Sequence, residues 1–454
     1  MAIEVQAARV EESDNAGPKE SALAWYGLIV LLMTTLFAYV VRQMLNLIGP
    51  SLQTTLGFDD LKIGLLQGLG MAIFASIASY PMGWLADRFG RRLILAIGVA
   101  VWSLATLSCA FQQSFSGLLA ATIGISIGEA GLAPIIYAMI PDLFPERRRN
   151  AANFIFYTGS MLGAGAGMAL GGALLHGLAI SHGDLPAWLA GIDTWRVAMM
   201  AVALPAPLFF LLVLTMPLGR KSAPPPKAAD GEQPTGRFLP YVKAHWRALV
   251  CVYGSIFAMA VCMTSALIWF PLALPRIFHI DPTTVGGRLG TVIAIATLVG
   301  VLLPVIVLTV RRRAVERHSL ALASAFIWLT PLPMAALPFV RTPFEAYVIA
   351  AIVGAMGVAA SSLMPGVLQN LAPLQLRSRV LAILGIANAL ALAISPMAIG
   401  ALSGLFAGPR GILQAIAVVS VPALAASALL AALAVRPYAK TVEALQDRSV
   451  ETRA

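Results

Sequence analysis

The stretch Gly-Trp-Leu-Ala-Asp-Arg-Phe-Gly-Arg-Arg at residues 83–92 joins two long apolar runs. Gly83 has no side chain, so another helix can approach closely there. Asp87 places a negative charge at the edge of an apolar segment, where it can face the positive N-terminal end of a neighbouring helix. Gly90 permits a sharp turn, and Arg91 and Arg92 anchor the loop on one side of a membrane. A generic basic turn needs the arginines, but it needs neither the aspartate nor the two glycines.

The composition of the whole chain agrees with a membrane protein. Of its 454 residues, 59% are hydrophobic and only 11% are charged, which is too few to cover a folded chain of this size with a polar surface. The net charge of +10 lies in short clusters between apolar segments, which is typical of membrane-protein orientation signals and not of a nucleic-acid-binding face. The three cysteines lie inside apolar runs without metal-ligand or disulfide spacing, so we interpret them as small apolar side chains.

A membrane-crossing helix needs about 20 apolar residues, and the chain contains twelve such runs. They cover residues 25–50, 61–83, 93–111, 115–140, 150–176, 195–216, 246–274, 286–310, 317–340, 343–369, 378–404 and 410–435. With both termini in the cytoplasm, the cytoplasmic loops between the spans hold seventeen lysines and arginines and the opposite loops hold six. This asymmetry predicts a multi-pass protein with both ends inside.

The order of the segments predicts two halves. An acidic tail, 1–24, precedes the first span and does not look like a signal peptide. The proline-rich, polar stretch 217–245 is typical of a linker, and it separates a half at 25–216 from a half at 246–435, which a cytoplasmic tail, 436–454, follows.

A weak internal repeat supports these halves. A shift of 228 residues superimposes the Pro–Arg turn 145–149 on 373–377, and the basic loop 84–92 on the basic loop 312–320. The second copy of the motif, at 311–317, lacks the glycines and the aspartate. Parallel repeats of this kind are a transporter architecture with the substrate site at the repeat interface.

Residues 83–92 resemble the G-x-L-x-D-R-x-G-R-R signature of the major facilitator superfamily, and every position of the signature matches. The resemblance implies an all-α membrane protein in which two pseudo-symmetric six-helix bundles rock about a central cavity. It also implies that Asp87 and Arg88 form a cytoplasmic gate with the start of span eleven near Ser378. Asp142, at the inner end of span four, is then expected to complete a charge cluster with Arg91.

Two ionisable residues lie deep within spans of the first half, Arg42 in span one and Glu129 in span four. A charge at the bilayer centre is costly unless it is paired or hydrated, so such residues are functional candidates. Glu129 can gain and lose a proton, which Arg42 practically cannot. Glu129 is therefore a candidate proton-coupling switch whose protonation frees Arg42 for an anionic substrate. The alternative is a fixed structural ion pair.

Four further stretches, in this order along the chain, look like the Spinster branch of the superfamily: residues 63–67 (IGLLQ), 128–131 (GEAG), 141–144 (PDLF) and 269–271 (WFP). Spinster-like members are associated with lysolipid and sphingolipid-like substrates. The chain departs from the branch at Val41, where an aspartate is usual, and at Thr122, where an arginine is usual. Half of the charge network of the branch is therefore missing, and proton coupling transfers only in part.

Other polar and small residues are candidates for the substrate cavity or for helix packing. Four glycines of span five, at positions 159, 163, 167 and 171, form a flat ridge that predicts close contact with another helix. The cavity candidates are Tyr157, Trp269, Asn153, Tyr137, Asn46 and Asn388. Tyrosine and tryptophan also serve as interface anchors, and asparagine also bonds between helices, so each has a structural alternative.

We therefore predict a secondary transporter for an amphipathic or lipid-like organic anion, coupled to protons. Efflux of hydrophobic drugs and uptake of organic carboxylates are alternatives. A membrane enzyme is disfavoured, because no nucleophile elbow, paired carboxylates, metal-spaced histidines or P-loop is present, and a receptor that lost transport is a further alternative. We expect a monomer in a bacterial inner membrane, with substrate, protons and lipid as partners, and no metal, other cofactor or nucleic acid.

Overall fold

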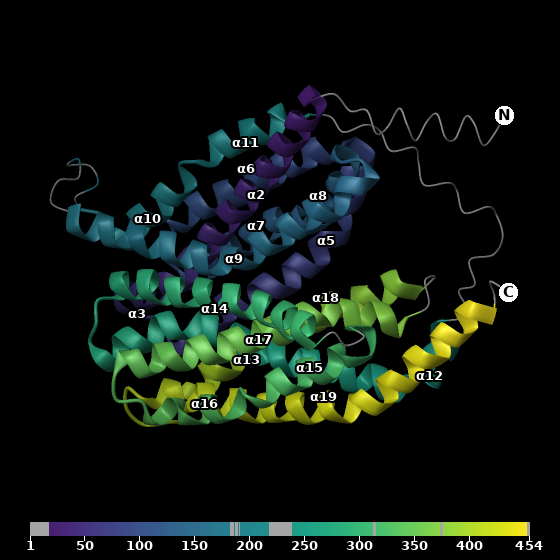
Figure 1. Ribbon diagram of the computed structural model, residues 1–454. Coiled ribbons are helices and arrows are strands. Elements are labelled where there is room, and N and C mark those ends of the chain that lie inside the picture. Colours follow the sequence, from purple (N-terminus) through teal and green to yellow (C-terminus); the bar gives the residue numbers. More distant parts are fainter. Residues whose placement is uncertain are drawn as a thin grey trace. The chain divides into compact units, whose positions relative to one another are not determined.

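The computed structural model describes residues 18–181, 186, 189, 191–217, 238–311, 315–372 and 376–451. In these ranges the regular secondary structure is helical and no strand is present (Figure 1). Among the described residues, twelve helical segments are long and apolar enough to cross a membrane. They are Ala22–Leu47, Asp60–Phe89, Arg91–Cys109, Phe115–Leu143, Ala151–Ile180, Thr194–Thr215, Trp246–Phe278, Pro282–Thr309, Ser319–Phe339, Pro343–Leu371, Ile383–Ser403 and Gly411–Glu443. The predicted all-α class and the twelve spans are confirmed.

The chain forms two compact units, and their boundaries cut through helices α2, α5 and α9. Unit 1 contains residues 1–42, 74–167 and 182–231, and unit 2 contains residues 43–73, 168–181 and 232–454. The helices that lie wholly or mainly in unit 1 are α2 (Pro18–Leu47), α5 (Gly70–Phe89), α6 (Arg91–Cys109), α7 (Phe115–Ala130), α8 (Leu132–Leu143), α9 (Glu146–Ile180), α10 (Thr194–Ala203) and α11 (Ala206–Thr215). The predicted halves, 25–216 and 246–435, stay a prediction.

The helices of unit 2 come from both ends of the chain. They are α3 (Gly49–Leu56), α4 (Asp60–Gly64), the π-helix η1 (Leu65–Leu69), α12 (Phe238–Ala244), α13 (Trp246–Phe278), α14 (Pro282–Arg311), α15 (Val315–Trp328), α16 (Pro331–Ala336), the 3-10 helix η4 (Leu337–Phe339), α17 (Pro343–Leu371), α18 (Arg377–Ser403) and α19 (Gly411–Glu451). Unit 2 therefore packs the end of the first span and the start of the second span against helices of the second half.

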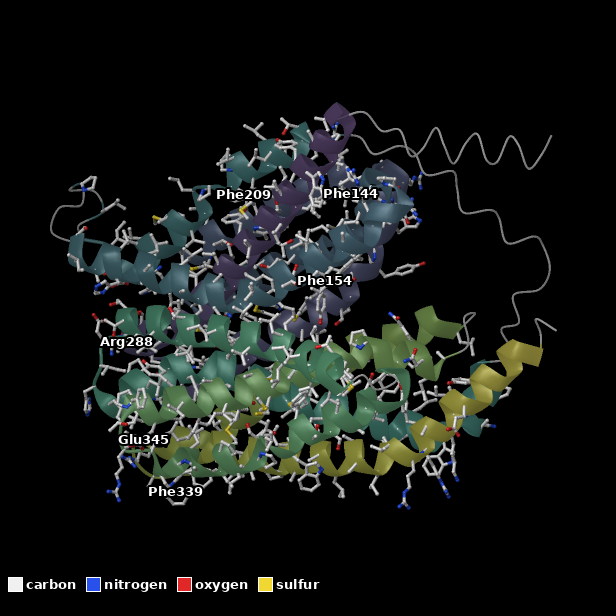
Figure 2. The ribbon with its side chains drawn as sticks, viewed as in Figure 1. Phe144, Phe154, Phe209, Arg288, Phe339 and Glu345 are labelled. Carbon is white, nitrogen blue, oxygen red and sulfur yellow. The ribbon has the colours of Figure 1, made fainter. Side chains whose placement is uncertain are left out.

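The core of unit 1 is built on α2. The ring of Phe37 stacks on Phe209 of α11, with centroids 4.5 Å apart and an interplanar angle of 7°. Phe209 is labelled in Figure 2. Trp25 meets Phe144 at the end of α8 edge-on, with centroids 5.1 Å apart. These aromatic contacts hold the ends of α8 and α11 against one helix.

The glycines of α9 lie against α2, as predicted. A Cβ atom on Gly159 would stand 2.5 Å from the end of the Leu32 side chain, which would have to shift. A Cβ atom on Gly167 would stand 2.8 Å from the carbonyl of Tyr39, so this position leaves no room for a side chain. Within unit 2, a Cβ on Gly171 would stand 3.1 Å from Leu47 of the same α2. The predicted close helix contact is confirmed, and its partner is span one.

In unit 2, α13 runs along α19 (Figure 1). The hydroxyl of Ser255 donates to the carbonyl of Ser427 (2.9 Å) and the hydroxyl of Ser427 donates to the carbonyl of Ser255 (2.8 Å), so the two backbones are linked in both directions. Next to this pair, Gly254 leaves room for Leu430 of α19. In lipid, hydrophobicity alone does not favour one helix contact over another. Small and hydroxyl residues therefore make the specific contacts between α13 and α19.

Three features differ from the sequence expectation. Residues 238–244 of the predicted linker form α12, whereas residues 218–237 lie outside the described residues. The predicted tail after residue 435 continues α19 to Glu451, because its alanines, leucine and long polar side chains favour helix. Span two contains the π-helical turn η1, which the hydropathy pattern does not reveal. The three cysteines are free, as expected.

Candidate functional site

Span four is interrupted next to Glu129. Helix α7 ends at Ala130 and α8 begins at Leu132, with Gly131 between them. One residue before Glu129, a Cβ on Gly128 would stand 2.6 Å from the amide nitrogen of Trp102, so α7 lies in backbone contact with α6. This contact fixes the height and rotation of the helix end that carries the carboxyl group.

One oxygen of the Glu129 carboxyl group is enclosed, whereas the residue as a whole is partly buried. Its Oε1 atom is buried and has no hydrogen-bond partner among the described residues. Arg42 of α2 interacts with it electrostatically, although no direct hydrogen bond or ion pair joins the two in the described part of the chain. An ionised carboxylate without a donor is costly in such a place, and a bound proton or an approaching cation removes that cost.

The two positions that depart from the Spinster pattern bring no second charge to this carboxyl group. Val41 is fully buried beside Arg42, and Thr122 lies two turns before Glu129 on α7 and is 1% exposed. The Thr122 hydroxyl donates to the carbonyl of Leu119 at 2.9 Å, so it is satisfied within its own helix. Arg42 is therefore the cation that acts on Glu129 in unit 1.

Three tyrosines complete the site. Tyr39 of α2 lies near Arg42 and Glu129, and Tyr137 of α8 and Tyr157 of α9 lie near Tyr39. We call these five residues the Glu129 cluster. It places one carboxyl group and one guanidinium group among phenol rings, which offer both apolar faces and hydroxyl groups to a ligand.

The other cavity candidates divide between the units. Asn153 lies one turn before Tyr157 on α9 and is half-buried. In unit 2, Asn46 is buried and donates to Gln43 at 2.6 Å. Trp269 is fully buried with no partner for its indole nitrogen among the described residues, and Asn388 is exposed on α18. The structure thus brings Arg42, Glu129, Tyr137 and Tyr157 together, adds Tyr39, and leaves the roles of the other candidates as predictions.

The predicted charge cluster at the end of span four is present. Arg91 at the start of α6 donates to Asp142 of α8 at 2.5 Å and to the carbonyl of Ala138 at 2.8 Å, and it contacts Asp87 at 3.5 Å. Arg88 instead lies over the ring of Trp84, 5.3 Å from its centroid. Arg91 and Asp142 are both partly buried and fix α6 to α8.

The glycines and the last arginine of residues 83–92 have different outcomes. Gly90 has φ +101°, a conformation that L side chains rarely adopt, so the predicted turn is confirmed. Arg92 donates to the carbonyl of Met216 at the end of α11, at 2.9 Å. Within unit 1 nothing described lies within 4 Å of the place of a Cβ on Gly83, so the close helix contact predicted there stays a prediction.

Gly90→Ala is expected to destabilise the protein by roughly 1–3 kcal/mol, because alanine must adopt a strained positive φ at this turn. The matched control is Gly177→Ala in α9, where the helix is regular and nothing lies within 4 Å of the added methyl. The measurement is the thermal unfolding midpoint of the purified proteins in detergent. Equal midpoints for Gly90→Ala and Gly177→Ala would show that the turn carries no strain.

A second polar cluster lies in unit 2 and was missed from the sequence. Arg276, at the end of α13, donates to both carboxylate oxygens of Asp60 in α4, at 2.5 and 2.9 Å. Gln53 of α3 donates to Asp60 at 2.6 Å, and Ser403 at the end of α18 donates to it at 2.8 Å. We call these four residues the Asp60 cluster. It joins α3 and α4, from the first half, to α13 and α18, from the second.

Close backbone packing supports the Asp60 cluster. A Cβ on Gly68 of η1 would stand 3.0 Å from the carbonyl of Leu392 in α18, so the π-helical turn lies directly on that helix. The Gln67 amide, in the same turn, donates to the carbonyl of Leu45 at 2.8 Å. Across the described residues, no group of three or more histidine, cysteine or acidic side chains is placed to hold a metal ion.

Comparison with known proteins places the chain in a family. The model of the Major Facilitator Superfamily matches residues 31–396. The sphingosine-1-phosphate transporter SPNS2 of Mus musculus is 29% identical over 257 residues, which are 54% of this chain and 43% of that protein. The gallate transporter of Pseudomonas putida is 29% identical over 183 residues, 40% of this chain and 37% of that protein. The matches thus span less than half the length of either relative.

Among solved structures, the inward-facing, unoccupied form of a bacterial homolog of the human lysosomal transporter Spinster has the same fold. Its TM-score is 0.73 at 19% sequence identity, and the match covers 94% of this chain and 98% of that chain. The family match, the twelve helices long enough to cross a membrane among the described residues and the complete signature at 83–92 all indicate the same family. The chain belongs to the Major Facilitator Superfamily, and it is similar to Spinster proteins of that superfamily.

Proposed function

We propose that this protein is a secondary transporter that moves an amphipathic or lipid-like organic anion by alternating access, coupled to protons. The observation that carries the proposal is the carboxyl group of Glu129, whose enclosed Oε1 lacks a partner while Arg42 acts on it without an ion pair. Such a group is poised to take up a proton, and it then leaves Arg42 as an unneutralised cation in the span. An anionic substrate supplies the countercharge.

The coupling cycle follows from these two residues. When Glu129 carries a proton, Arg42 attracts the substrate's anionic group, and when Glu129 is ionised, it competes with the substrate for Arg42. Proton release and substrate release therefore favour each other on the same side of the membrane. Tyr39, Tyr137 and Tyr157 offer ring faces to an apolar tail and hydroxyl groups to a polar head.

The Asp60 cluster supplies the conformational part of the proposal. Alternating access requires contacts between the two halves of the sequence to form on one side and break on the other. Asp60 and Gln53 come from the first half, and Arg276 and Ser403 from the second. We assign the Asp60 cluster the role of a closure that forms when the predicted extracytoplasmic side is shut.

Two named relatives support two substrate classes. The mouse relative is named for a lipid phosphate, sphingosine 1-phosphate, which fits an arginine among apolar and aromatic groups. The Pseudomonas relative is named for gallate, an aromatic carboxylate, so uptake of aromatic carboxylates is the second candidate. Both classes place an anionic group on Arg42, whereas efflux of hydrophobic cations would use Glu129 alone. The proposal includes a monomer in a bacterial inner membrane.

Arg42→Ala is expected to weaken binding of an anionic amphiphile by roughly 10- to 100-fold, because a charge-assisted hydrogen bond contributes about 1.5–3 kcal/mol. Binding is measured as thermal stabilisation of the purified protein by lysophosphatidate, by gallate, by tetraphenylphosphonium and by a neutral monoacylglycerol of the same chain length. Wild type is expected to prefer lysophosphatidate to the monoacylglycerol, and Arg42→Ala is expected to bind them equally.

The matched control for this test is Arg288→Ala. Arg288 is exposed on α14 and its removal subtracts the same charge (Figure 2). It should leave the preference for lysophosphatidate unchanged. Stabilisation by gallate alone among the anions would select the second candidate, and stabilisation by tetraphenylphosphonium alone would contradict the anion proposal.

A further inference from the structure

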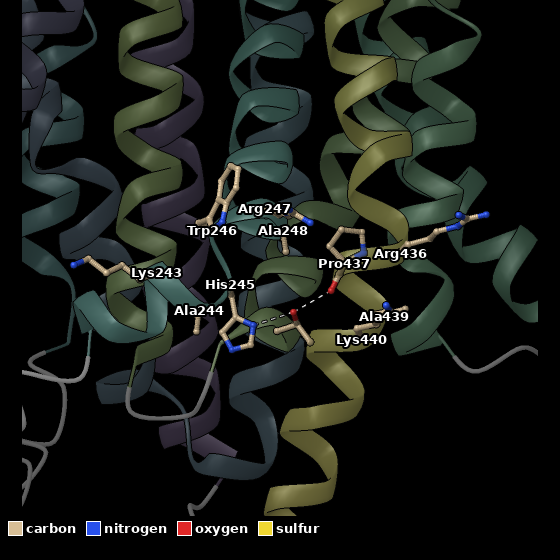
Figure 3. A pocket seen from close by; sticks show the side chains of 11 residues that line it. Lys243, Ala244, His245, Trp246, Arg247, Ala248, Arg436, Pro437, Ala439 and Lys440 are labelled. Carbon is tan, nitrogen blue, oxygen red and sulfur yellow. Dashed lines mark hydrogen bonds between the residues drawn. The ribbon is translucent and has the colours of Figure 1, made fainter.

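A basic cavity lies in unit 2 between the α12–α13 junction and α19 (Figure 3). Its volume is about 760 Å³, within the range of sites that hold small ligands. The cationic side chains around it are Lys243, Arg247, Arg436 and Lys440, joined by His245. No carboxylate is among its lining residues in the described part of the chain. None of these residues belongs to the Glu129 cluster or the Asp60 cluster.

The floor of the cavity is held by hydrogen bonds. Thr441 donates its single hydroxyl proton to the carbonyl of Pro437 at 3.0 Å, so Nδ1 of His245, 3.1 Å away, donates to the Thr441 oxygen. Tyr241 of α12 lies over the His245 ring, with centroids 4.8 Å apart, and donates to the carbonyl of Leu371. Burial raises the pKa of Tyr241 to about 12, so its hydroxyl stays a donor. The cavity is therefore a built feature of α12, α13, α17 and α19.

The cations are gathered where α12, α13 and α19 meet at the cavity. Arg436 and Lys440 are four residues apart on α19, where like charges repel and destabilise a helix by a few tenths of a kcal/mol. Arg247 lies over the ring of Trp246, 5.6 Å from its centroid. Membrane orientation explains the number of basic residues at this end of the bundle, but it does not require them to surround one cavity.

Exposed apolar side chains continue from the cavity along both helices. On α13, Trp246 and Val250 are 53% and 57% exposed and one turn apart. On α19, Leu429 and Leu433 are 54% and 56% exposed, and Arg436 and Lys440 follow them at helical spacing on the same face. Each helix thus presents an apolar stripe that ends in cations at the cavity. This order matches a lipid, with acyl chains along the stripes and the headgroup at the basic end.

We propose that this cavity binds the phosphate headgroup of an anionic phospholipid from the leaflet on the predicted cytoplasmic side. Lys243 and Arg247 approach the headgroup from the α12–α13 junction, and Arg436 and Lys440 approach it from α19. Basic pockets between helices on this side of a membrane are suited to such headgroups. The bound lipid adds a link between α13 and α19, beyond their serine contacts.

The test measures lipid binding to the full-length protein in detergent by native mass spectrometry, with cardiolipin, phosphatidylglycerol and phosphatidylcholine as probes. The wild type is expected to bind the two anionic lipids in preference to phosphatidylcholine. Arg436→Gln combined with Lys440→Gln is expected to weaken anionic-lipid binding roughly thirtyfold, at about tenfold per 1.4 kcal/mol and about 1 kcal/mol per basic residue. The control pair, Arg288→Gln with Arg410→Gln, removes two exposed charges elsewhere and should bind as wild type does.

Several results would overturn this proposal. The proposal would be wrong if the Arg436/Lys440 double variant bound anionic lipid with wild-type affinity. An equal loss of affinity in the Arg288/Arg410 double variant would show that general charge attraction explains the binding. Full competition by millimolar glycerol phosphate would assign the cavity to a soluble anion. If the first pair folds poorly, Lys243→Gln with Arg247→Gln tests the other wall of the cavity. Arg42→Ala should leave cardiolipin binding unchanged, so failure of this proposal and failure of the transport proposal are distinguishable.

Discussion

Glu129→Gln is expected to abolish accumulation of substrate driven by a pH gradient, while the protein still folds and still exchanges substrate across the membrane. Glutamine has the shape of a protonated glutamate but cannot release a proton, so Arg42 stays free in every state. Because the enclosed Oε1 atom has no donor among the described residues, removing the charge should not reduce stability. We expect the accumulation ratio to fall at least tenfold, to the level of facilitated diffusion.

The measurement uses proteoliposomes with an imposed pH gradient and a labelled lysophosphatidate or gallate, whichever stabilises the protein. The matched control is Glu345→Gln at the start of α17. There the carboxylate accepts from the exposed amide of Arg341 at 2.7 Å, and glutamine can accept the same bond. Glu345→Gln should accumulate substrate as wild type does. Accumulation by Glu129→Gln at the wild-type level would exclude Glu129 as the coupling residue.

Arg276→Ala is expected to open the contact between the first and second halves that the Asp60 cluster makes. Removing the arginine leaves Asp60, whose side chain is 14% exposed, without its countercharge. The free-energy cost of removing the arginine lies between the costs for an exposed and a buried ion pair, at roughly 2 kcal/mol. This cost shifts the equilibrium between the closed and the open contact about thirtyfold toward the open contact. Gln53 and Ser403 still bond Asp60, so the helices should stay folded.

The opening is measured as the distance between spin labels on Thr55 and Arg410, which are both exposed in unit 2, in a background with the three cysteines replaced by alanine. The Arg276→Ala distribution should gain a population at longer distance. Arg288→Ala, which removes an exposed arginine from α14, should leave the distribution unchanged. An unchanged distribution in Arg276→Ala would show that the Asp60 cluster is not the contact that opens.

Hydropathy and one motif were enough to predict the fold class. An apolar run of about 20 residues has few structural alternatives to a membrane-crossing helix. Residues 83–92 match a long motif that is specific to one superfamily. The same physical argument found Arg42 and Glu129, because charges within apolar spans are visible in the sequence. Asp142 and Arg91 were predicted as a pair from the family resemblance and form one at 2.5 Å.

Features that depend on tertiary contacts were not predicted. Asp60 and Arg276 are 216 residues apart, and each looks like an ordinary charge at the end of a span. In the sequence, Tyr39 looks like any other tyrosine in an apolar run. Its contact with α9 is visible only in the structure. No partner for Gly83 lies in the described part of unit 1. A glycine shows that a contact is sterically allowed and not that a partner is present. The continuation of α19 to Glu451 was missed because hydropathy detects a span and not a helix.

The most direct test of proton-coupled anion transport is the reverse flux. Proteoliposomes that contain a pH-sensitive dye, with the membrane potential clamped, are given a gradient of the substrate that stabilises the protein. The account predicts that substrate movement changes the internal pH in wild type and in Glu345→Gln, and that Glu129→Gln moves substrate with no pH change. Substrate movement by wild type without any pH change would contradict it, and the protein would then be a facilitative carrier.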